Sequence, residues 1–302
     1  MEKKPEIIII GGPTATGKTK LSVALAKEFG GEIISADSVQ IYKKLDIGSA
    51  KPTKEEMDGI PHHMIDIIEP NDSFSVCDFV TRAKDDIKDI LSRGKLPIIA
   101  GGTGLYISSL VDNVSFTEAE TDLTLRDELI KKAEKIGAEA LYSELEKIDP
   151  ESAKRIHPNN IKRVIRALEI YYQTGKTMTQ QNELSKLTES PYTYKMFALS
   201  SDRELIYERI NKRVDVMVDD GLFDEVSSLL NAGITRDMQS MQAIGYKEIV
   251  SFFEGALTKD EAIEAVKQNS RRYAKRQLTW FRRDERYLWL DIAKDIDISS
   301  LI

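Results

Sequence analysis

Six short apolar runs recur along the chain, each with the length of a buried β-strand. They cover residues 6–10, 32–36, 62–67, 96–100, 194–200 and 286–291. Between most of them the apolar positions repeat with helical spacing, as in the segment that starts at Val76, reaches Leu91 and is closed by Gly94. Ser75 and Asp78 form a capping pair at the predicted start of that helix. Strands that alternate with helices predict an α/β fold, a parallel sheet flanked by helices on both faces.

The segment 115–193 breaks this alternation, because it is polar and charged and lacks strand-like runs. It predicts several helices, the last of which ends at Gly175. These helices are expected at residues 123–136, 139–147 and 160–172. We therefore expect a catalytic core domain formed by residues 1–114 plus 194–302, and a separate all-helical insertion domain at 115–193.

The first apolar run leads directly into the sequence GGPTATGKT over residues 11–19. This is the G-x-x-x-x-G-K-T phosphate loop, in which backbone N–H groups surround a phosphate and the next helix presents its positive end. It predicts a P-loop NTPase-like sheet. Lys18 should add a mobile positive charge, and the Thr19 hydroxyl should hold Mg²⁺. The predicted phosphate-binding residues are Gly12, Pro13, Thr14, Ala15, Thr16, Gly17, Lys18 and Thr19.

Two other polar sequences follow strand runs and should meet the phosphate loop on one rim, because ligands bind at the carboxyl ends of parallel strands. Asp37 follows the second run, and the Gly-rich turn 101–104 follows the fourth. Asp37 can cap a turn, contact a nucleotide, bind Mg²⁺ through water or accept a proton. Ser38 and Gln40 carry groups suited to a base edge. Thr103 should approach the phosphate or the reacting atom.

Two further features allow more than one interpretation. His62 and His63 are adjacent, so their side chains face opposite sides of an extended segment and a paired metal site is disfavoured. Arg209 and Arg213 lie four residues apart on a predicted helix. Each can be an ordinary solvated arginine, or it can supply a cation to a diphosphate.

Composition narrows the class of protein. The 302 residues are 41% hydrophobic and 31% charged, which is typical of a globular chain able to bury a substantial core. Cys77 is the only cysteine, so an internal disulfide and a thiolate-rich zinc site are excluded. The N-terminal apolar run is too short for a signal peptide or a membrane span. We expect a cytoplasmic protein that does not contact membranes.

The net charge of −7 gives no global sign of nucleic-acid binding, so such a surface must be a local patch. One candidate is the stretch from Arg271 to Arg286, where basic residues far outnumber Asp284 and Glu285. This stretch can contact phosphates, or it can form an amphipathic helix that packs on the sheet.

Together these motifs resemble the tRNA dimethylallyltransferases, also called tRNA isopentenyltransferases, over residues 5–290. Asn160 stands where an aspartate is more usual in that family. The chain ends without the zinc-finger extension of many eukaryotic members, so we expect a bacterial-type enzyme. Besides the phosphate loop, the matching segments are SADSVQIY (35–42), PHHMID (61–66), GGTGLY (101–106), RVIRALE (163–169), RINKRVD (209–215), QAIGYKE (242–248) and RYAKRQLTWFR (272–282).

The resemblance implies a transferase that moves the dimethylallyl group of dimethylallyl diphosphate to the exocyclic amine of the adenosine 3′ to the tRNA anticodon. The products are N6-(dimethylallyl)adenosine and diphosphate. The phosphate loop would then hold the diphosphate of the prenyl donor, although its pattern suggests ATP. Asp37 matches the general base, and Thr103 a residue that contacts the target nucleotide and the bridging oxygen. Lys18, Arg213 and Mg²⁺ would stabilise the leaving charge.

The same resemblance implies that tRNA is bound through its anticodon stem-loop by a protein expected to be a monomer. The helical insertion would clamp the anticodon stem. The implied tRNA-binding residues are Asp37, Ser38, Val39, Gln40, Thr103, Arg126, Lys162, Arg163, Val164, Ile165, Arg166, Gln242, Ala243, Ile244, Gly245, Tyr246 and Lys247.

Three other functions compete with this one. A P-loop nucleotide or small-molecule kinase would use the insertion as a lid over ATP. An adenylate isopentenyltransferase, acting on AMP, ADP or ATP, would lack most of the insertion that is present here. An RNA-binding module with a vestigial loop is disfavoured because Lys18, Thr19 and Asp37 are all retained.

Overall fold

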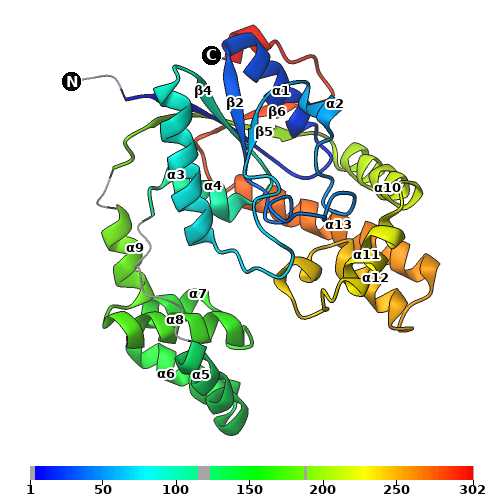
Figure 1. Cartoon of the computed structure of the whole chain (residues 1–302). Helices are drawn as coiled ribbons and strands as arrows, with labels where there is room; N and C mark the ends of the chain where they lie inside the picture. Colours follow the sequence, from blue (N-terminus) through cyan, green and yellow to red (C-terminus); the bar gives the residue numbers. More distant parts are fainter. Residues whose placement is uncertain (1–3, 115–122, 187–188, 302) are drawn as a thin grey trace. The chain divides into compact units, whose positions relative to one another are not determined.

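The structure is a computed structural model that describes residues 4–114, 123–186 and 189–301. The chain divides into two compact units (Figure 1). The first is formed by Met1–Leu110 together with Pro191–Ile302, and the second by Val111–Ser190. The first unit contains the sheet, and the second is helical in its described part.

The described residues of the first unit form a six-stranded sheet in the order β3-β2-β4-β1-β5-β6. Every strand pair is parallel, which confirms the predicted α/β class. β1 lies near the centre, where Ile8 pairs with Ile98 of β4 and with Lys195 of β5. The strands are β1 (Glu6–Gly11), β2 (Gly31–Ser35), β3 (His62–His63), β4 (Leu96–Ala100), β5 (Thr193–Ser200) and β6 (Tyr287–Asp291).

Helices cover both faces of this sheet. The four isoleucines Ile7–Ile10 are all 0% exposed, although successive side chains of a strand point to opposite faces. Ile8 and Ile10 pack against the apolar side of α1, while α3 and the end of α13 lie on other parts of the sheet (Figure 1). The helices of this unit are α1 (Lys18–Phe29), α2 (Lys54–Met57), α3 (Val76–Ser92), α4 (Gly104–Val111), α10 (Arg203–Asp219), α11 (Leu222–Asn231), α12 (Tyr246–Phe253) and α13 (Lys259–Phe281), with 3-10 turns η1 (Gln239–Gln242) and η2 (Ile298–Leu301).

Local sequence signals correctly predict where the helix α3 begins. The Ser75 hydroxyl accepts the N–H of Asp78 at 3.2 Å, and the Asp78 carboxylate accepts the N–H of Ser75 at 2.8 Å. This capping box starts α3, as predicted.

The strand predicted at 62–67 is wrong beyond His63. Met64 and Asp66 have φ of 63° and 55°, in the left-handed region that a strand does not use.

The second unit consists, where described, of α5 (Leu123–Ile136), α6 (Ala138–Ile148), α7 (Pro150–Arg155), α8 (Ile161–Thr174) and α9 (Met178–Lys186). The three helices predicted in this segment are confirmed. The Asn160 side chain caps α8 by accepting the N–H of Arg163, so the amide performs here the capping role that an aspartate also fills. Gly175 ends α8 with a φ of 68°, as predicted.

An ion cluster joins α5 to α8 inside the second unit. Glu169 on α8 is only 1% exposed, and its Oε2 accepts Nη2 of Arg126 at 2.9 Å and Nη1 of Arg166 at 3.2 Å. Burial alone would raise the pKa of Glu169, but the hydrogen bonds from the two guanidinium groups lower it below its ordinary value. The buried carboxylate therefore depends on both arginines.

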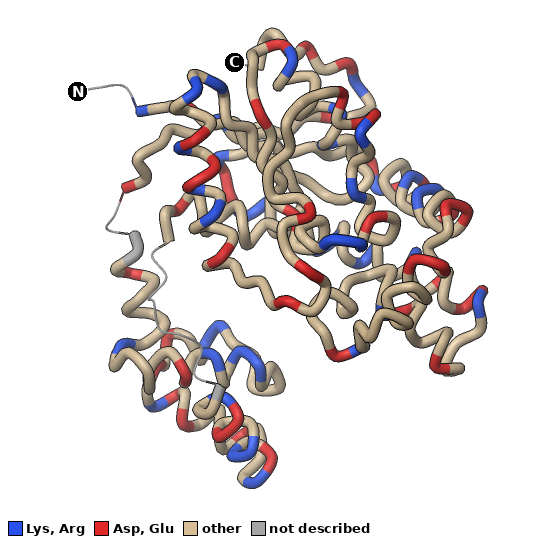
Figure 2. Tube along the Cα trace, in the orientation of Figure 1, with Lys and Arg blue, Asp and Glu red and all other residues tan. Residues whose placement is uncertain are grey.

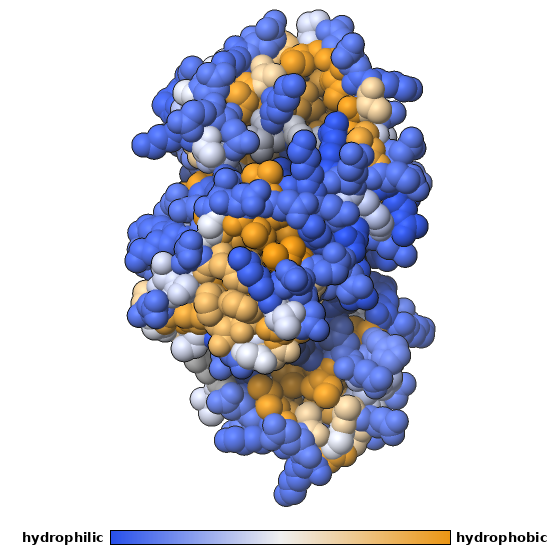
Figure 3. Space-filling view, turned by 90° about the vertical axis from the view of Figure 1, so that its right-hand side faces the viewer, coloured by the Kyte–Doolittle hydropathy of each residue, from blue (hydrophilic) through white to orange (hydrophobic). Residues whose placement is uncertain are grey.

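Charges of both signs are interspersed along most elements (Figure 2). Hydrophilic side chains cover much of the face drawn in Figure 3, with apolar patches between them. None of the helices in the described ranges combines the length and apolar composition that a bilayer span requires.

We predict that Arg126→Ala destabilises the second unit by about 1–3 kcal/mol, because it leaves a buried carboxylate with one partner fewer. Urea denaturation followed by circular dichroism measures the effect. Since the pKa of Glu169 is lowered in the folded state, the effect should be present at neutral pH and shrink below about pH 4, as the carboxylate takes up a proton. Arg163→Ala, on the exposed side of α8, is the control. Equal midpoints for the two variants would contradict the prediction.

Candidate active site

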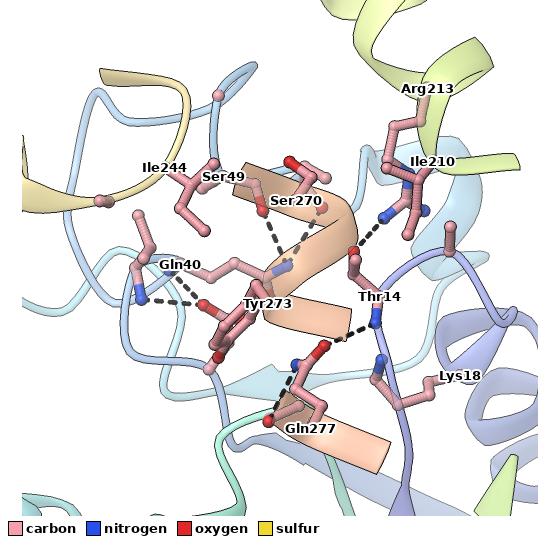
Figure 4. A pocket seen from close by; sticks show the side chains of 18 of the residues that line it. Thr14, Lys18, Gln40, Ser49, Ile210, Arg213, Ile244, Ser270, Tyr273 and Gln277 are labelled. Carbon is pink, nitrogen blue, oxygen red and sulfur yellow. Dashed lines mark hydrogen bonds between the residues drawn. The ribbon is translucent and has the colours of Figure 1, made fainter. Parts of the chain in front are cut away.

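Three turns meet at the carboxyl ends of β1, β2 and β4, on the rim where the sequence predicts them. The phosphate loop follows β1, Asp37 follows β2, and the Gly101–Gly102 turn follows β4. With α10 and α13 they enclose a cavity of about 490 Å³ (Figure 4). The described residues that line it include Thr14, Ala15, Gly17, Lys18, Thr19, Asp37, Ser38, Val39, Gln40, Glu56, Gly101, Gly102, Arg213, Gln242, Ala243, Ile244, Lys247, Ser270, Tyr273, Arg276 and Gln277.

The phosphate loop has the backbone conformation that its glycines predict. Gly12 has a φ of +132°, and a Cβ there would lie 2.6 Å from the Leu199 carbonyl oxygen, so only glycine fits. Lys18 is the first residue of α1, whose N-terminal N–H groups therefore face the cavity rim. The Thr16 hydroxyl and the Lys18 ammonium both donate to the Pro13 carbonyl at 2.8 Å, which closes the loop on itself.

Lys18 lies in an environment that weakens its hold on its proton. Burial, and to a smaller extent the nearby Arg213 guanidinium, lower the pKa of the Lys18 ammonium to about 8, while the Asp37 carboxylate acts in the opposite direction. An anionic ligand in the cavity, in addition to the Asp37 carboxylate, would favour the charged form of the Lys18 ammonium. The site is thus prepared electrostatically for a phosphate group.

Arg213 reaches the phosphate loop from α10. Its Nη1 donates to the Thr14 hydroxyl at 3.2 Å (Figure 4). Desolvation lowers the pKa of the guanidinium, and the carboxylates of Glu56 and Asp37 oppose that shift. Of the two arginines that the sequence left open, Arg213 lines the cavity, whereas Arg209 is exposed and does not line it.

Asp37 holds a turn and still has a free oxygen. Its Oδ1 accepts the N–H groups of Val39 at 2.8 Å and Gln40 at 3.3 Å. In the described part of the chain, Oδ2 has no hydrogen-bond partner. The two interpretations of this residue are therefore compatible, since one oxygen caps the turn and the other is available to a ligand.

Thr103 and Gln40 fix the walls of the cavity. The Thr103 hydroxyl accepts the Ser38 N–H at 3.2 Å, and Thr103 is not among the described residues that line the cavity. Gln40 accepts the Ser35 hydroxyl at 3.0 Å and donates to the Ala50 carbonyl at 3.1 Å. A base contact by Gln40 stays a prediction, as does the contact of Thr103 with either substrate.

Sequence reasoning missed two site residues on α13. Gln277 is 5% exposed; its Oε1 accepts the Thr14 N–H at 2.9 Å and its Nε2 donates to the Gly102 carbonyl at 3.0 Å (Figure 4). Burial raises the pKa of Tyr273 to about 12, and its phenol lies beside the side chains of Thr103 and Gln277. A polar Gln277 between the apolar Ala274 and Phe281, at helical spacing, was the available signal.

Glu225 on α11 is a third residue that sequence reasoning missed. Its carboxylate accepts the backbone N–H groups of residues 46, 47 and 48 at 2.9, 2.7 and 3.1 Å, and the Tyr246 hydroxyl at 2.7 Å. It thereby ties the loop beside Gln40 to the 242–247 stretch. In that stretch Gln242, Ala243, Ile244 and Lys247 line the cavity, whereas Gly245 and the buried Tyr246 stand behind it.

The remaining predicted tRNA-binding residues belong to the second unit. The side chains of Val164 and Ile165 are buried in its core, so they cannot reach a partner from there. Arg126 and Arg166 bind Glu169. Lys162 and Arg163 are exposed at the start of α8. That the second unit contacts tRNA stays a prediction, which rests on the exposed side chains of Lys162 and Arg163.

Oxygen ligands suited to Mg²⁺ are present in the cavity. In the parts of the chain that the structure describes, no cluster of three or more His, Cys, Asp or Glu side chains forms a metal cage. Thr19, Asp37 and Glu56 nevertheless line one space. Mg²⁺ commonly binds to one or two protein oxygens together with substrate phosphates, so these residues fit such an ion.

The chain matches two protein families. The family described as IPP transferase matches residues 40–284, and the family described as Isopentenyl transferase matches residues 5–73. A tRNA dimethylallyltransferase of Bacillus cereus (strain AH187) is 52% identical over 300 residues, which cover 99% of this chain and 94% of that protein. One of Bacillus anthracis is 51% identical, with 99% and 95% covered.

Solved structures give the same result. A tRNA isopentenylpyrophosphate transferase from Bacillus halodurans is 48% identical, with a TM-score of 0.74 over 99% of this chain and 94% of that one. A eukaryotic dimethylallyltransferase acting on tRNA is 32% identical, with a TM-score of 0.81 over 95% of this chain and 74% of that one.

We predict that diphosphate binding depends on the protonation of Lys18. Because the pKa of the free ammonium is about 8 and an anion favours the charged form, binding should take up protons near pH 8. Affinity should then fall above pH 8 by up to about tenfold per pH unit. Calorimetric titration with inorganic diphosphate, in two buffers of different ionisation enthalpy, measures this uptake.

Lys18→Arg is the matched control, since the guanidinium keeps the charge but does not titrate in this range. Protons that diphosphate itself takes up contribute equally to the proton uptake measured with the two proteins. The wild type should therefore take up more protons than the variant. Equal uptake by the two would show that Lys18 is already fully charged.

Proposed function

This chain belongs to the tRNA dimethylallyltransferase family, and we propose that its rim cavity brings together the two substrates of that family's reaction. It is a transferase that modifies an adenosine of tRNA with a dimethylallyl group. The donor is dimethylallyl diphosphate, and the acceptor is the exocyclic amine of the adenosine 3′ to the anticodon. The observation that carries the proposal is that two cations and a carboxylate with a free oxygen line one cavity: Lys18, Arg213 and Asp37.

The donor half of the cavity stabilises a leaving diphosphate. As the allylic carbon–oxygen bond breaks, positive charge develops on the carbon and negative charge on the diphosphate. Lys18 comes from the phosphate loop and Arg213 from α10, so cations approach the same anion from two elements. Fixed charges in a partly desolvated site stabilise such a leaving group more than water does.

Mg²⁺ fits the same half of the cavity. We propose that the Thr19 hydroxyl would hold it together with the diphosphate, and that the carboxylates of Asp37 and Glu56, which line the same cavity, would add negative charge beside it. When bound, the ion would add positive charge to the leaving group. Lys18 and Arg213 retain their roles with or without it.

The acceptor half contains Asp37. As the bond from the adenine nitrogen to the allylic carbon forms, the amine must lose a proton, and Oδ2 of Asp37 is available to accept it. An adenine amine is a weak nucleophile, so a positioned proton acceptor should contribute about 10²–10⁴-fold. The backbone N–H groups of Val39 and Gln40 hold the other oxygen and so orient the carboxylate.

The tRNA must present its adenosine outside the base stack. Unstacking one nucleotide costs a few kcal/mol, and contacts in the pocket have to offset that cost. The polar edges of Ser38 and Gln40, with Gln242 and Lys247, line the cavity and suit such contacts. We propose that the helical unit binds the anticodon stem through exposed cations such as Lys162 and Arg163.

The function is tested by incubating the protein with radiolabelled dimethylallyl diphosphate and Mg²⁺, together with either tRNA or free AMP, ADP or ATP. Label should appear in tRNA alone, at the adenosine beside the anticodon. Label in the free nucleotides would instead identify an adenylate isopentenyltransferase. Phosphate transfer from ATP, without prenylation, would identify a kinase.

We predict that Asp37→Asn lowers the single-turnover rate of prenyl transfer by about 10²–10⁴-fold while tRNA binding persists. Asparagine keeps an oxygen that can accept the Val39 and Gln40 N–H groups, so the turn is preserved and only the proton acceptor is lost. Quenched-flow measurement with enzyme in excess gives the rate, and filter binding gives the tRNA affinity. A wild-type rate in this variant would exclude Asp37 as the base.

A further inference from the structure

The Glu225 carboxylate on α11 is bound by four donors, and Glu225 is not among the described residues that line the active-site cavity. Its Oε2 accepts the backbone N–H groups of Asp46 at 2.9 Å and Ile47 at 2.7 Å. Its Oε1 accepts the N–H of Gly48 at 3.1 Å and the Tyr246 hydroxyl at 2.7 Å. Consecutive N–H groups that converge in this way form a concave anion site, which the protein fills with its own carboxylate. Each oxygen of Glu225 thus has two donors, which is the full capacity of a carboxylate.

The two segments that Glu225 joins also pack tightly on each other. A Cβ on Gly48 would lie 2.6 Å from the Tyr246 ring, and one on Gly245 would lie 3.5 Å from the Gly48 carbonyl oxygen. Any side chain at position 48 would therefore displace the ring. Residues 46–50 and the 242–247 stretch meet through this packing and through the shared carboxylate.

Hydrogen bonds inside segment 46–50 extend that restraint toward the cavity. The Ser49 hydroxyl donates to the Leu45 carbonyl at 2.6 Å, and the Ala50 N–H donates to the Ile47 carbonyl at 3.0 Å. The segment is therefore a compact turn and not an extended strap. Fixing its first three N–H groups also fixes its last two carbonyl groups.

Those two carbonyl groups set the orientation of Gln40. They accept its Nε2 at 3.4 Å for Ser49 and 3.1 Å for Ala50, and because a carbonyl only accepts, the amide nitrogen must face them. The amide oxygen lies at the other end, where it accepts the Ser35 hydroxyl at 3.0 Å and retains a second lone pair. Gln40 and Ser49 line the cavity on the side away from Lys18 (Figure 4).

We propose that Glu225 is a positioning residue for the acceptor: it holds segment 46–50 against the 242–247 stretch and so presents the amide of Gln40 to the adenine in one orientation. The inference rests on the proposed function, because that function brings an adenosine into this cavity. An oxygen lone pair suits the amine of adenine, which donates, whereas a reversed amide would present its own N–H groups. The phosphate loop is held separately, by Gln277, so Glu225 should matter for the acceptor and not for the donor.

The test compares Glu225→Gln with Asp224→Asn. In the first variant an NH₂ group would face backbone N–H donors, which releases segment 46–50. The second removes the same charge from the adjacent exposed residue of α11, and it should keep the wild-type constants. Steady-state prenylation of an anticodon stem-loop transcript gives kcat/KM, which should fall by about 10- to 100-fold in Glu225→Gln. KM for dimethylallyl diphosphate should stay within about twofold of the wild-type value.

A double-mutant cycle with Gln40 separates positioning from a general loss of stability. Gln40→Ala alone should lower kcat/KM for the transcript by about 5- to 10-fold. If Glu225 acts through Gln40, the same change made in Glu225→Gln should lower it further by no more than about twofold. Two residues that act independently would instead give the product of the single effects, which would overturn the inference. Circular dichroism establishes that each variant is folded.

Tyr246→Phe is a milder form of the same change, since it removes one of the four donors and keeps the ring against Gly48. It should lower kcat/KM for the transcript by about 2- to 10-fold and leave KM for dimethylallyl diphosphate unchanged. This variant tests the inference even if Glu225→Gln does not fold.

Two further results would overturn the inference while the proposed function stands. One is a wild-type kcat/KM for the transcript in both Glu225→Gln and Tyr246→Phe. The other is an equal loss for transcript and donor in these variants, which indicates general damage to the site. If the wild type itself prenylates no tRNA, it is the proposed function that fails.

Discussion

The side-chain amide of Gln277 is the contact on which the active-site geometry depends. It accepts the Thr14 N–H with its oxygen and donates to the Gly102 carbonyl with its nitrogen, so one side chain joins the turns that follow β1 and β4. The space is tight, since a Cβ on Gly102 would lie 2.2 Å from Nε2. Each of these buried groups would cost about 1–3 kcal/mol if left unpaired. The Gln277 amide therefore fixes the spacing of the two turns.

The cations of the cavity differ in a way that matters for a leaving diphosphate. Desolvation brings the pKa of Lys18 to about 8, so its charge responds to whatever else occupies the cavity. Desolvation also lowers the pKa of Arg213, but a guanidinium starts from so high a pKa that it remains charged at neutral pH. The charge of Arg213 is thus permanent, whereas the charge of Lys18 is favoured by the anion that it binds. Asp37 supports the charged form of both, because it lies close enough to oppose the loss of either proton.

The sequence was most informative where a structure is set by neighbours along the chain. Five of the six strands, the phosphate loop and the Ser75 and Gly175 helix ends all follow from short spacings, and the structure confirms them. The strand after His62 was overestimated because its left-handed residues are not glycines, so the sequence carried no sign of the bend. Contacts between residues that are far apart in the sequence could not be predicted from it. Gln277 binds Thr14 across 263 residues, and Arg126 binds Glu169 across 43. Single motifs could therefore identify Lys18 and Asp37, but they could not identify the side chains that hold the loops in place.

α13 brings these separate features onto one rigid element. Its core side, with Ala274 and Phe281, packs against the first unit, and a Cβ on Gly11 would lie 2.6 Å from the Phe281 ring. A second side presents Tyr273 and Gln277 to the cavity. Its exposed side carries Arg272 and Lys275. Because the core side of α13 is fixed by packing, the amide of Gln277 is fixed with it, and the packing of the first unit thereby sets the spacing between the phosphate loop and the Gly102 turn.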